Sequence, residues 1–333
     1  MQLAVGVAAI KVQTVFPVKT SRRLFRSFLS FALVFASAGQ MLAAQAYIMV
    51  DAKTGYVVQE RNSRQKRQVG SLTKIATAMV VLDWAEHKGG DLGQMATVPP
   101  DAMTGVSENL VGLQPGDEIS LRDALYAALV QSDNVAAYTL ADHVGRAIQG
   151  IVPAGANSTP VGTFVGQMNA LAATLKMSRT HFTNPAGLDA DVKPLPYSTA
   201  EDMARLTRYA LNKAGFRFYV SQKERQISWK RAGANKDYML RNTNELLGQN
   251  GVDGVKTGRT ARAGDCLILS AAREAEVVKL GENNARVMPR NLIIVLLGSA
   301  NRFEEGKQLL GMGWQLYDQW AAAGRMVDPK KVL

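Results

Sequence analysis

Three short polar clusters stand in a fixed order along the chain: Ser71 to Lys74, Ser132 to Asn134, and Lys256 to Gly258. The first places a lysine three residues after a serine, the second reads Ser-Asp-Asn, and the third reads Lys-Thr-Gly. A serine hydroxyl attacks a carbonyl once a neighbouring base takes its proton, and a lysine can be that base in place of a histidine. Each cluster alone is common by chance. Their order and their surroundings together predict serine acyl-transfer chemistry.

The first cluster leads into residues 75–82, which are apolar almost all round. Such a run predicts a buried helix, with Ser71 in its first turn and Lys74 one turn on and on the same face. The unpaired N–H groups at the start of that helix can receive the oxyanion formed when Ser71 attacks a carbonyl. Because burial disfavours charged lysine, we expect Lys74 to act as the base, helped by the second cation Lys256. The competing interpretation is a helix cap followed by a surface lysine, and the other two clusters argue against it.

The second cluster follows a predicted helix. A capping signal at Ser120 precedes the apolar run 124–130, so Ser132 and Asn134 should lie in a loop at the edge of a cleft. There Ser132 would relay a proton between Lys74 and the leaving nitrogen, while Asn134 would hold the substrate amide. The alternative is an ordinary Ser-Asp-Asn turn.

The third cluster lies in a predicted strand, turn and strand at residues 251–272. Lys256 and Thr257 offer a cation and a hydroxyl to a carboxylate, and Gly258 leaves room for a substrate backbone along the strand. The backbone of Arg259 would supply a second oxyanion N–H group opposite the nucleophile, and its side chain would add charge. We therefore expect a substrate with a free carboxylate near the scissile bond. The alternative is a β-hairpin with a solvated basic edge.

Further stretches carry a family resemblance in the same order: the opening hairpin 47–58, then 181–189, 197–203 and 252–255. Over roughly residues 46–320 the chain resembles the D-alanyl-D-alanine carboxypeptidases, the low-molecular-weight penicillin-binding proteins of bacterial cell-wall metabolism. The resemblance implies an α/β (α+β) fold of the β-lactamase/transpeptidase-like type. An antiparallel sheet flanked by helices would lie beside a mainly helical lobe, with the active site between them.

The resemblance also implies an activity. Enzymes of this family remove the terminal D-alanine from peptidoglycan stem pentapeptides through an acyl-enzyme on serine, and β-lactam antibiotics inhibit them covalently. The catalytic residues would be Ser71, Lys74 and Ser132, and the substrate-binding residues would be Asn134, Lys256, Thr257, Gly258 and Arg259. No cofactor is implied.

Three features depart from the family pattern. Arg259 stands where many members carry a histidine, and the tail 326–333 is too short for the C-terminal β domain and amphipathic anchor of many members. Residues 263–267, together with the single-domain length, resemble the related endopeptidases, which cut cross-links between wall peptides. A D,D-endopeptidase is therefore the alternative function, and a catalytically silent wall-binding protein is a further one.

A β-lactamase would add a glutamate that activates the deacylating water, commonly in a Glu-x-x-Leu-Asn pattern. No such pattern lies between Asn134 and Lys256. We therefore expect slow release of bound penicillin.

Residues 1–46 contain five bases and no acid, and they include an apolar run at 28–38. This pattern predicts a signal peptide, cut after Ala46 or alternatively after Ala43. Export would be to the periplasm or cell envelope. An Arg22-Arg23 pair resembles a twin-arginine signal, although an ordinary Sec signal is favoured. An uncleaved signal that anchors the chain in the membrane is a third possibility.

The predicted division of the chain is a signal peptide at 1–46, a penicillin-binding peptidase domain at 47–325 and a short tail at 326–333. Within the domain, the apolar and polar patterns predict several further elements. These are an amphipathic helix at 164–175, a helix capped by Ser198 with Glu201, a charged hairpin at 272–289, a buried strand at 292–297, a final helix at 303–320 and a small-residue loop at 150–160.

Composition and charge limit the kinds of molecule that the chain is expected to bind. The net charge of +11 falls to +6 without residues 1–46, a balance that suits an anionic wall better than nucleic acid, for which no aromatic-basic motif is present. Cys266 is the only cysteine and lies in an apolar strand, so we expect a buried thiol and no internal disulfide. His87, His143 and His181 lack metal-ligand spacing, and no metal is expected.

Overall fold

Helices and strands are mixed along the chain. The computed structural model describes residues 42–333 apart from 107–108, 150, 152–158, 191 and 280–283. The predicted signal peptide up to residue 41 and most of the predicted loop 150–160 therefore lie outside the described residues. In chain order the elements are β1 (Ala46–Asp51), β2 (Val57–Arg61), the 3-10 helix η1 (Gly70–Thr73), α2 (Lys74–Lys88), β3 (Met95–Thr97), η2 (Pro100–Met103), β4 (Glu118–Ser120), α3 (Leu121–Leu129), α4 (Asn134–Ile148), α5 (Pro160–Thr174), α6 (Ala200–Leu211), α7 (Ala214–Val220), β5 (Glu224–Arg231), β6 (Ala234–Arg241), β7 (Val252–Thr260), β8 (Gly264–Lys279), β9 (Ala285–Ser299), α8 (Arg302–Ala322) and η3 (Pro329–Lys331).

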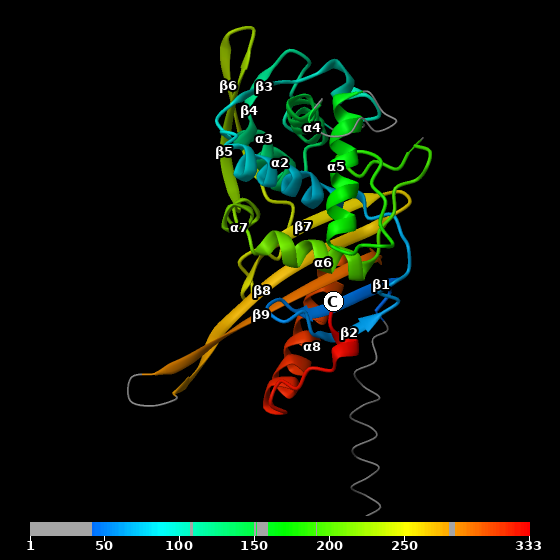
Figure 1. Ribbon diagram of the computed structural model, residues 1–333, viewed down its shortest axis with the longest axis vertical. Coiled ribbons are helices and arrows are strands. Elements are labelled where there is room, and N and C mark those ends of the chain that lie inside the picture. The colour runs from blue at the N-terminus through cyan, green and yellow to red at the C-terminus, as the bar shows by residue number, and fades with distance from the viewer. Residues whose placement is uncertain (1–41, 107–108, 150, 152–158, 191, 280–283) are drawn as a thin grey trace, which may run out of the picture. The chain divides into compact units, whose positions relative to one another are not determined.

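The main sheet has the strand order β2-β1-β9-β8-β7, and every neighbouring pair is antiparallel (Figure 1). Side chains alternate between its two faces. Met49 and Ile294 lie on the face that α8 covers, where Gly313 packs against both. Ile48 and Val50 point to the other face and join the central apolar core together with residues of α6. The opening hairpin and the buried strand predicted at 292–297 are thus confirmed within β1, β2 and β9.

The second part of the fold is mainly helical, with α2, α3, α4 and α5 packed together beside a smaller sheet of order β3-β4-β5-β6 (Figure 1). Helix α2 is buried on nearly every side over the predicted stretch, from Ile75 to Val81. A helix without a polar face needs protein on all sides, and helices α3 to α7 together with η1 supply it. The predicted fold class, an antiparallel sheet flanked by helices beside a helical lobe, is confirmed.

Two helices meet at the second polar cluster. Ser120 caps α3 as predicted, because its hydroxyl accepts a hydrogen bond from the backbone N–H of Asp123 at 3.0 Å. Asp133 caps α4 in the same way, accepting from the N–H of Ala136 at 2.8 Å. Ser120 lies at the far end of α3, whereas Asp133 closes the short connection of residues 130–133 between the two helices. Ser132 lies in this connection with a left-handed backbone, at a φ of 66°. Asn134, predicted in the same loop, is instead the first residue of α4, because Asp133 caps that helix.

The predicted cap of the helix at 200–211 is wrong by one residue. Thr199, not Ser198, is the N-cap of α6, and its hydroxyl accepts from the N–H of Asp202 at 3.0 Å. Ser198 instead pairs through its backbone with Arg67, and its hydroxyl lies 2.8 Å from that of Thr180. That bridge holds Ser198 in extended geometry, so the helix begins later than the sequence pattern indicated.

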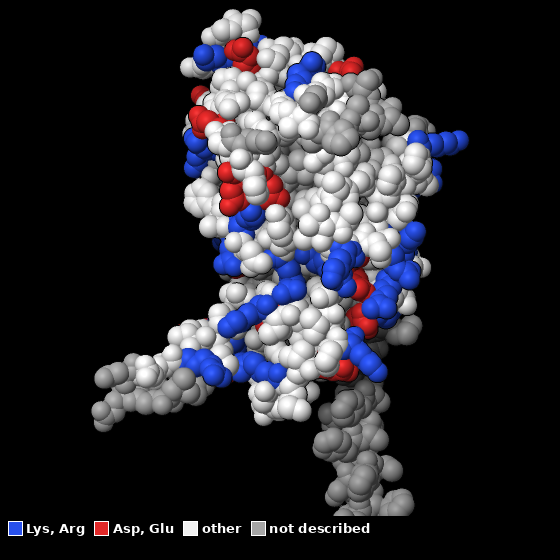
Figure 2. Space-filling view, in the orientation of Figure 1, with Lys and Arg blue, Asp and Glu red and all other residues white. Residues whose placement is uncertain are grey.

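Strands β8 and β9 continue beyond the main sheet as a two-stranded arm (Figure 1), which confirms the charged hairpin predicted at 272–289. Val277 and Val287 face each other across it and are both largely exposed. Arg290 and Glu276 form an ion pair at its base, and Arg290 also contacts Asp318 of α8. Blue side chains lie along this arm and across the middle of the visible face in Figure 2.

The chain from Met326 to Leu333 lies against the opening hairpin. Tyr56 forms a β-bridge with Val332, and the N–H of Leu333 donates to the carbonyl of Gly55 at 3.1 Å. The ring of Tyr56 also stacks on that of Trp320, with centroids 4.6 Å apart. Across the described part of residues 42–333, no helix combines the length and the apolar character needed to span a membrane.

The contact between α4 and α5 yields a test of this packing. A Cβ added to the buried Gly145 of α4 would lie 2.0 Å from the carbonyl oxygen of Pro160, at the start of α5. We predict that Gly145→Ala lowers the free energy of unfolding by about 1–3 kcal/mol, because the two helices must move apart. Thermal or urea unfolding of the purified protein measures this loss.

Gly166 of α5 is the matched control, since a Cβ added there meets nothing within 4 Å. Gly166→Ala should stabilise the protein by about 0.5–1 kcal/mol through helix propensity alone. Equal effects of the two substitutions would contradict the close approach of α4 and α5.

Candidate active site

The amino group of Lys74 joins three segments that are far apart in the sequence. Its Nζ lies 2.8 Å from Ser71 Oγ, 2.7 Å from Asn134 Oδ1 and 3.2 Å from the carbonyl oxygen of Ala186. Ser71 sits in the 3-10 turn η1, one turn before Lys74, as the three-residue spacing predicted. The lysine side chain is fully buried. The first and second polar clusters are therefore in direct contact.

Burial sets the charge of this lysine. It lowers the pKa of Lys74 to about 7, while the carboxylate of Asp133 opposes that shift. Burial in turn raises the pKa of Asp133, although hydrogen bonds from the N–H groups of Ala136 and Val111 favour its ionised form. A large fraction of Lys74 is therefore neutral near pH 7, and neutral lysine can accept the proton of the Ser71 hydroxyl.

The third cluster lies on β7, beside the nucleophile turn. Lys256 is buried and donates a hydrogen bond from Nζ to the carbonyl oxygen of Thr257 at 3.0 Å. Burial lowers its pKa well below the usual value, and the charges of Lys74 and Arg302 lower it further. The hydroxyl of Thr257 lies 2.6 Å from that of Thr243. The amine of Lys256, which was predicted to bind a substrate carboxylate, is thus buried, whereas Thr257 lines the cleft.

A cleft of about 780 Å³ opens over these residues. Six of the eight predicted site residues line it, and Lys74 and Lys256 lie just beneath its floor. The six are Ser71, Ser132, Asn134, Thr257, Gly258 and Arg259. The hydroxyl of Ser132 makes no hydrogen bond with Lys74 or any other described residue, so its role as a proton relay remains a prediction.

Gly258 is required by a contact within the protein that the sequence did not reveal. A Cβ at this position would lie 2.7 Å from the carbonyl oxygen of Val69 and 3.1 Å from the backbone nitrogen of Ser71. The missing side chain therefore makes room for the turn that carries Ser71. That it also leaves room for a substrate backbone along β7 remains a prediction. Strand β7 can lie against η1 only because this residue is glycine.

Two arginines at the cleft differ in their surroundings. The side chain of Arg259 is 75% exposed and lies 3.4 Å from Asp265. Arg302, at the start of α8, is 18% exposed, and its Nη1 donates to the carbonyl oxygen of Gly258 at 3.1 Å and lies 3.3 Å from Asp265. The sequence analysis missed Arg302 because no motif marks it and its neighbours in space are 37 and 44 residues away.

The loop at 184–189 was also missed as part of the site. The side-chain oxygen of Asn184 accepts hydrogen bonds from the N–H groups of Ala186, Gly187 and Leu188, at 3.1, 2.7 and 3.0 Å. This turn aims the carbonyl of Ala186 at Lys74. Gly187 has a φ of 81°, and a Cβ there would lie 2.0 Å from the carbonyl oxygen of Gly70. The stretch carried the family resemblance, so a signal existed, but nothing in it indicated a contact with the lysine.

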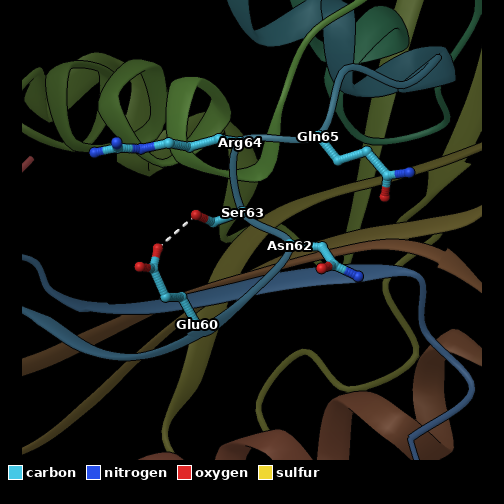
Figure 3. Close-up of a pocket in the computed structure, with 5 residues that line it drawn as sticks. All are labelled: Glu60, Asn62, Ser63, Arg64 and Gln65. Atoms are coloured by element: carbon cyan, nitrogen blue, oxygen red, sulfur yellow. Dashed lines mark hydrogen bonds between the residues drawn. The ribbon is translucent and has the colours of Figure 1, made fainter.

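A second hollow, of about 500 Å³, lies at the end of β2 and is lined by residues 60–65 apart from Arg61. Figure 3 shows the side chains of Arg64 and Gln65 pointing in opposite directions, while Ser63 donates a hydrogen bond to Glu60. Its polar groups do not converge on a common point, and among the lining residues the Ser63 hydroxyl has only the carboxylate of Glu60 as a partner. The cleft over Ser71 is therefore the candidate active site, since its nucleophile and base converge.

Known proteins resemble this chain over most of its length. D-alanyl-D-alanine carboxypeptidase DacC of Escherichia coli (strain K12) is 32% identical over 285 residues, which cover 83% of this chain and 62% of DacC. The chain thus spans less than two thirds of the length of that relative. The D-alanyl-D-alanine endopeptidase of Pseudomonas aeruginosa (strain PAO1) is 31% identical over 243 residues, which cover 72% of this chain and 71% of the endopeptidase.

A solved structure shares the fold. Penicillin-binding protein D2 from Listeria monocytogenes, in its ampicillin-bound form, matches with a TM-score of 0.64 and 26% identity, covering 83% of this chain and 99% of that one. A family model described as D-alanyl-D-alanine carboxypeptidase matches residues 34–281. Because this match covers well over half of the chain and contains all three polar clusters, the protein belongs to the D-alanyl-D-alanine carboxypeptidase family of serine peptidases.

Proposed function

We propose that the protein is a serine-type D-alanyl-D-alanine carboxypeptidase that removes the terminal D-alanine from peptidoglycan stem pentapeptides. One observation carries the proposal: the buried amine of Lys74 contacts both Ser71 and Asn134 at the foot of an open cleft. A nucleophile, a base with a pKa of about 7 and an amide group then converge where a peptide carbonyl can lie. Membership of the carboxypeptidase family supports the same activity.

In the proposed reaction, Ser71 Oγ attacks the carbonyl carbon of the penultimate D-alanine while its proton passes to Lys74 Nζ. The oxyanion that forms would accept hydrogen bonds from the backbone N–H groups of Ser71 and Arg259. The C–N bond then breaks, and the departing amine of D-alanine takes up a proton by way of Ser132. The acyl group remains on Ser71 until water hydrolyses the ester and restores the hydroxyl.

The substrate carboxylate would lie at the β7 side of the cleft. The hydroxyl of Thr257 can donate to it, and Arg259 and Arg302 bring positive charge to the same wall. The buried Lys256 adds its field from below when protonated. This arrangement favours a peptide that ends close to the scissile bond, which is what a carboxypeptidase requires.

A D,D-endopeptidase is the second candidate. The Pseudomonas aeruginosa relative bears that name, and this chain spans 71% of it, against 62% of the E. coli carboxypeptidase DacC. Both activities would use the same acyl-enzyme and would differ only in the amine that leaves. Peptidoglycan stem peptides and β-lactam antibiotics are the proposed ligands in either case, and the periplasm or cell envelope is the proposed location.

The first prediction separates the two candidates. We expect the purified protein, incubated with a mixture of pentapeptide monomers and cross-linked dimers, to remove one alanine from the pentapeptides and leave the dimers intact. Mass spectrometry follows both substrates at once. Splitting of dimers into monomers would replace the carboxypeptidase with the endopeptidase.

Two variants complete that experiment. Ser71→Ala should abolish either activity, because it removes the nucleophile. Ser221 is an exposed serine at the end of α7, and Ser221→Ala should retain full activity. Turnover by Ser71→Ala would contradict the acyl-enzyme mechanism. A folded but inactive wild-type protein would favour a wall-binding role.

The pKa of Lys74 predicts how acylation depends on pH. Because the neutral amine is the base, the rate of acylation by a fluorescent penicillin should rise with pH through a midpoint near 7 and level off above it. One pH unit below that midpoint the rate should be about tenfold lower than on the plateau. Stopped-flow or gel-based labelling from pH 5 to pH 9 measures the profile.

Asp133→Asn is the matched variant for this profile. The carboxylate of Asp133 raises the pKa of Lys74, so removing its charge should move the midpoint to lower pH. Asparagine is also a good N-cap, which preserves the start of α4. A profile that is flat in the wild type, or a midpoint that moves upward in Asp133→Asn, would rule out Lys74 as the base.

Slow release of penicillin is a further prediction, because the sequence lacks the glutamate pattern of a β-lactamase between Asn134 and Lys256. After a brief exposure to penicillin and removal of the excess, intact-mass measurement should detect the adduct on Ser71 for many minutes. Return to the unmodified mass within seconds would mean that the protein deacylates as a β-lactamase does.

A further inference from the structure

Glu305, in the first turn of α8, is a buried carboxylate with neutral partners. Its side chain accepts hydrogen bonds from the backbone N–H of Ala44, at 2.7 Å, and from the hydroxyl of Ser299. The residue is only 7% exposed, and none of the described residues forms an ion pair with it. A buried carboxylate is costly unless a cation lies beside it. The backbone nitrogen of Ala44 is one of its two hydrogen-bond donors, and the guanidinium of Arg61 donates to the carbonyl oxygen of the same residue at 2.8 Å.

Residues 44–46 belong to the folded domain. Ala44 is completely buried, the N–H of Gln45 donates to the carbonyl of Leu297 at 3.1 Å, and Ala46 stands in register with Leu297 on β9. Asn62, one of the residues drawn in Figure 3, donates from Nδ2 to the carbonyl of Gln45 at 2.9 Å. A cut after Ala46 would remove three residues that these contacts hold in place.

Ala43 is the first residue of the compact folded unit. It is exposed, whereas Ala44 is buried. Signal peptidases favour a small side chain directly before the cut and another two residues upstream. Ala43 provides the first and Met41 stands at the second, so the packing of residues 44–46, and not the motif, favours this site. The sequence analysis left Ala43 open as the alternative to Ala46.

We propose that the exported protein is cut between Ala43 and Ala44, and that the new α-ammonium group of Ala44 pairs with the carboxylate of Glu305. The inference rests on the proposed export of the chain. A signal peptidase adds water across the Ala43–Ala44 peptide bond. Ala43 leaves as a carboxylate on the released leader, and the nitrogen of Ala44 takes up protons to become an ammonium. The amide donor seen at 2.7 Å from Glu305 then becomes a cation at the same place.

The N-terminus of the exported chain tests the cut directly. The full chain is expressed in a Gram-negative host, purified from the cell envelope and analysed by N-terminal sequencing and intact mass. We expect the sequence to begin at Ala44. A start at Tyr47, or at any residue before Ala44, overturns the proposal.

Ala43→Leu sharpens the same test, because leucine is too large for the residue before the cut but is tolerated farther from it. The exposed position of Ala43 keeps this change out of the core. We expect Ala43→Leu to abolish the cut at Ala44 and to leave the full precursor. An unchanged N-terminus in this variant would mean that the signal peptidase does not recognise Ala43, and it would overturn the proposal.

Glu305→Gln tests the ion pair. In the processed protein it leaves a buried ammonium without its counter-ion, so the melting temperature should fall by about 5 °C or more. In the uncut Ala43→Leu precursor, where Ala44 has a neutral amide, the same substitution should cost less than half as much, measured in the same detergent buffer.

Ser299→Ala is the control, since it removes a hydrogen bond to Glu305 and keeps the charge. Its effect should be similar in the two forms. Equal losses from Glu305→Gln with and without processing would overturn the pairing. None of these readouts depends on peptidase activity, so the proposed function and this inference can fail independently.

Discussion

The arrangement of the cleft depends on the burial of one amine. Lys74 has no exposed surface, and its Nζ is held by Ser71, Asn134 and the carbonyl of Ala186. A lysine with these contacts on the surface would stay protonated and would be no base. Placing it inside the protein costs free energy, and three separate segments must meet around it for its hydrogen bonds to be made. These segments are the buried helix α2, the capped turn before α4 and the loop at 184–189.

The parts of the site that local geometry controls could be predicted from the sequence. Ser71 and Lys74 meet because residues three apart on a helical turn share a face, and the cap at Ser120 marks the start of α3, the helix that precedes Ser132. The parts that depend on distant backbone atoms could not. Ala186 contributes only a carbonyl, which every residue has, and it lies 112 positions from Lys74. No side-chain pattern can mark such a partner.

The wrong cap and the unforeseen contact of Gly258 have related causes. Ser198 and Thr199 are both good caps, and the pairing of Ser198 with Arg67 decides between them. Gly258 permits close approach in either explanation, but only the structure identifies the approaching group as the turn of Ser71. In both cases the residue type was read correctly, and a tertiary contact determined its partner. Arg302 is a similar case, because its position beside Gly258 follows from the packing of α8.

Two glycines lie very close to the backbone of the turn that carries Ser71. Gly258 on β7 and Gly187 in the loop each approach the backbone of residues 69–71 so closely that neither could carry a Cβ without displacing it. The backbone of the turn that carries Ser71 is therefore held by main-chain contacts, and its position depends little on neighbouring side chains. Divergence among relatives of this fold would then be confined to the rim of the cleft, at positions such as Arg259, where a side chain is largely solvated and can be exchanged without moving the serine. On the proposed mechanism, exchange of such a side chain would change which leaving group the cleft admits without moving Ser71.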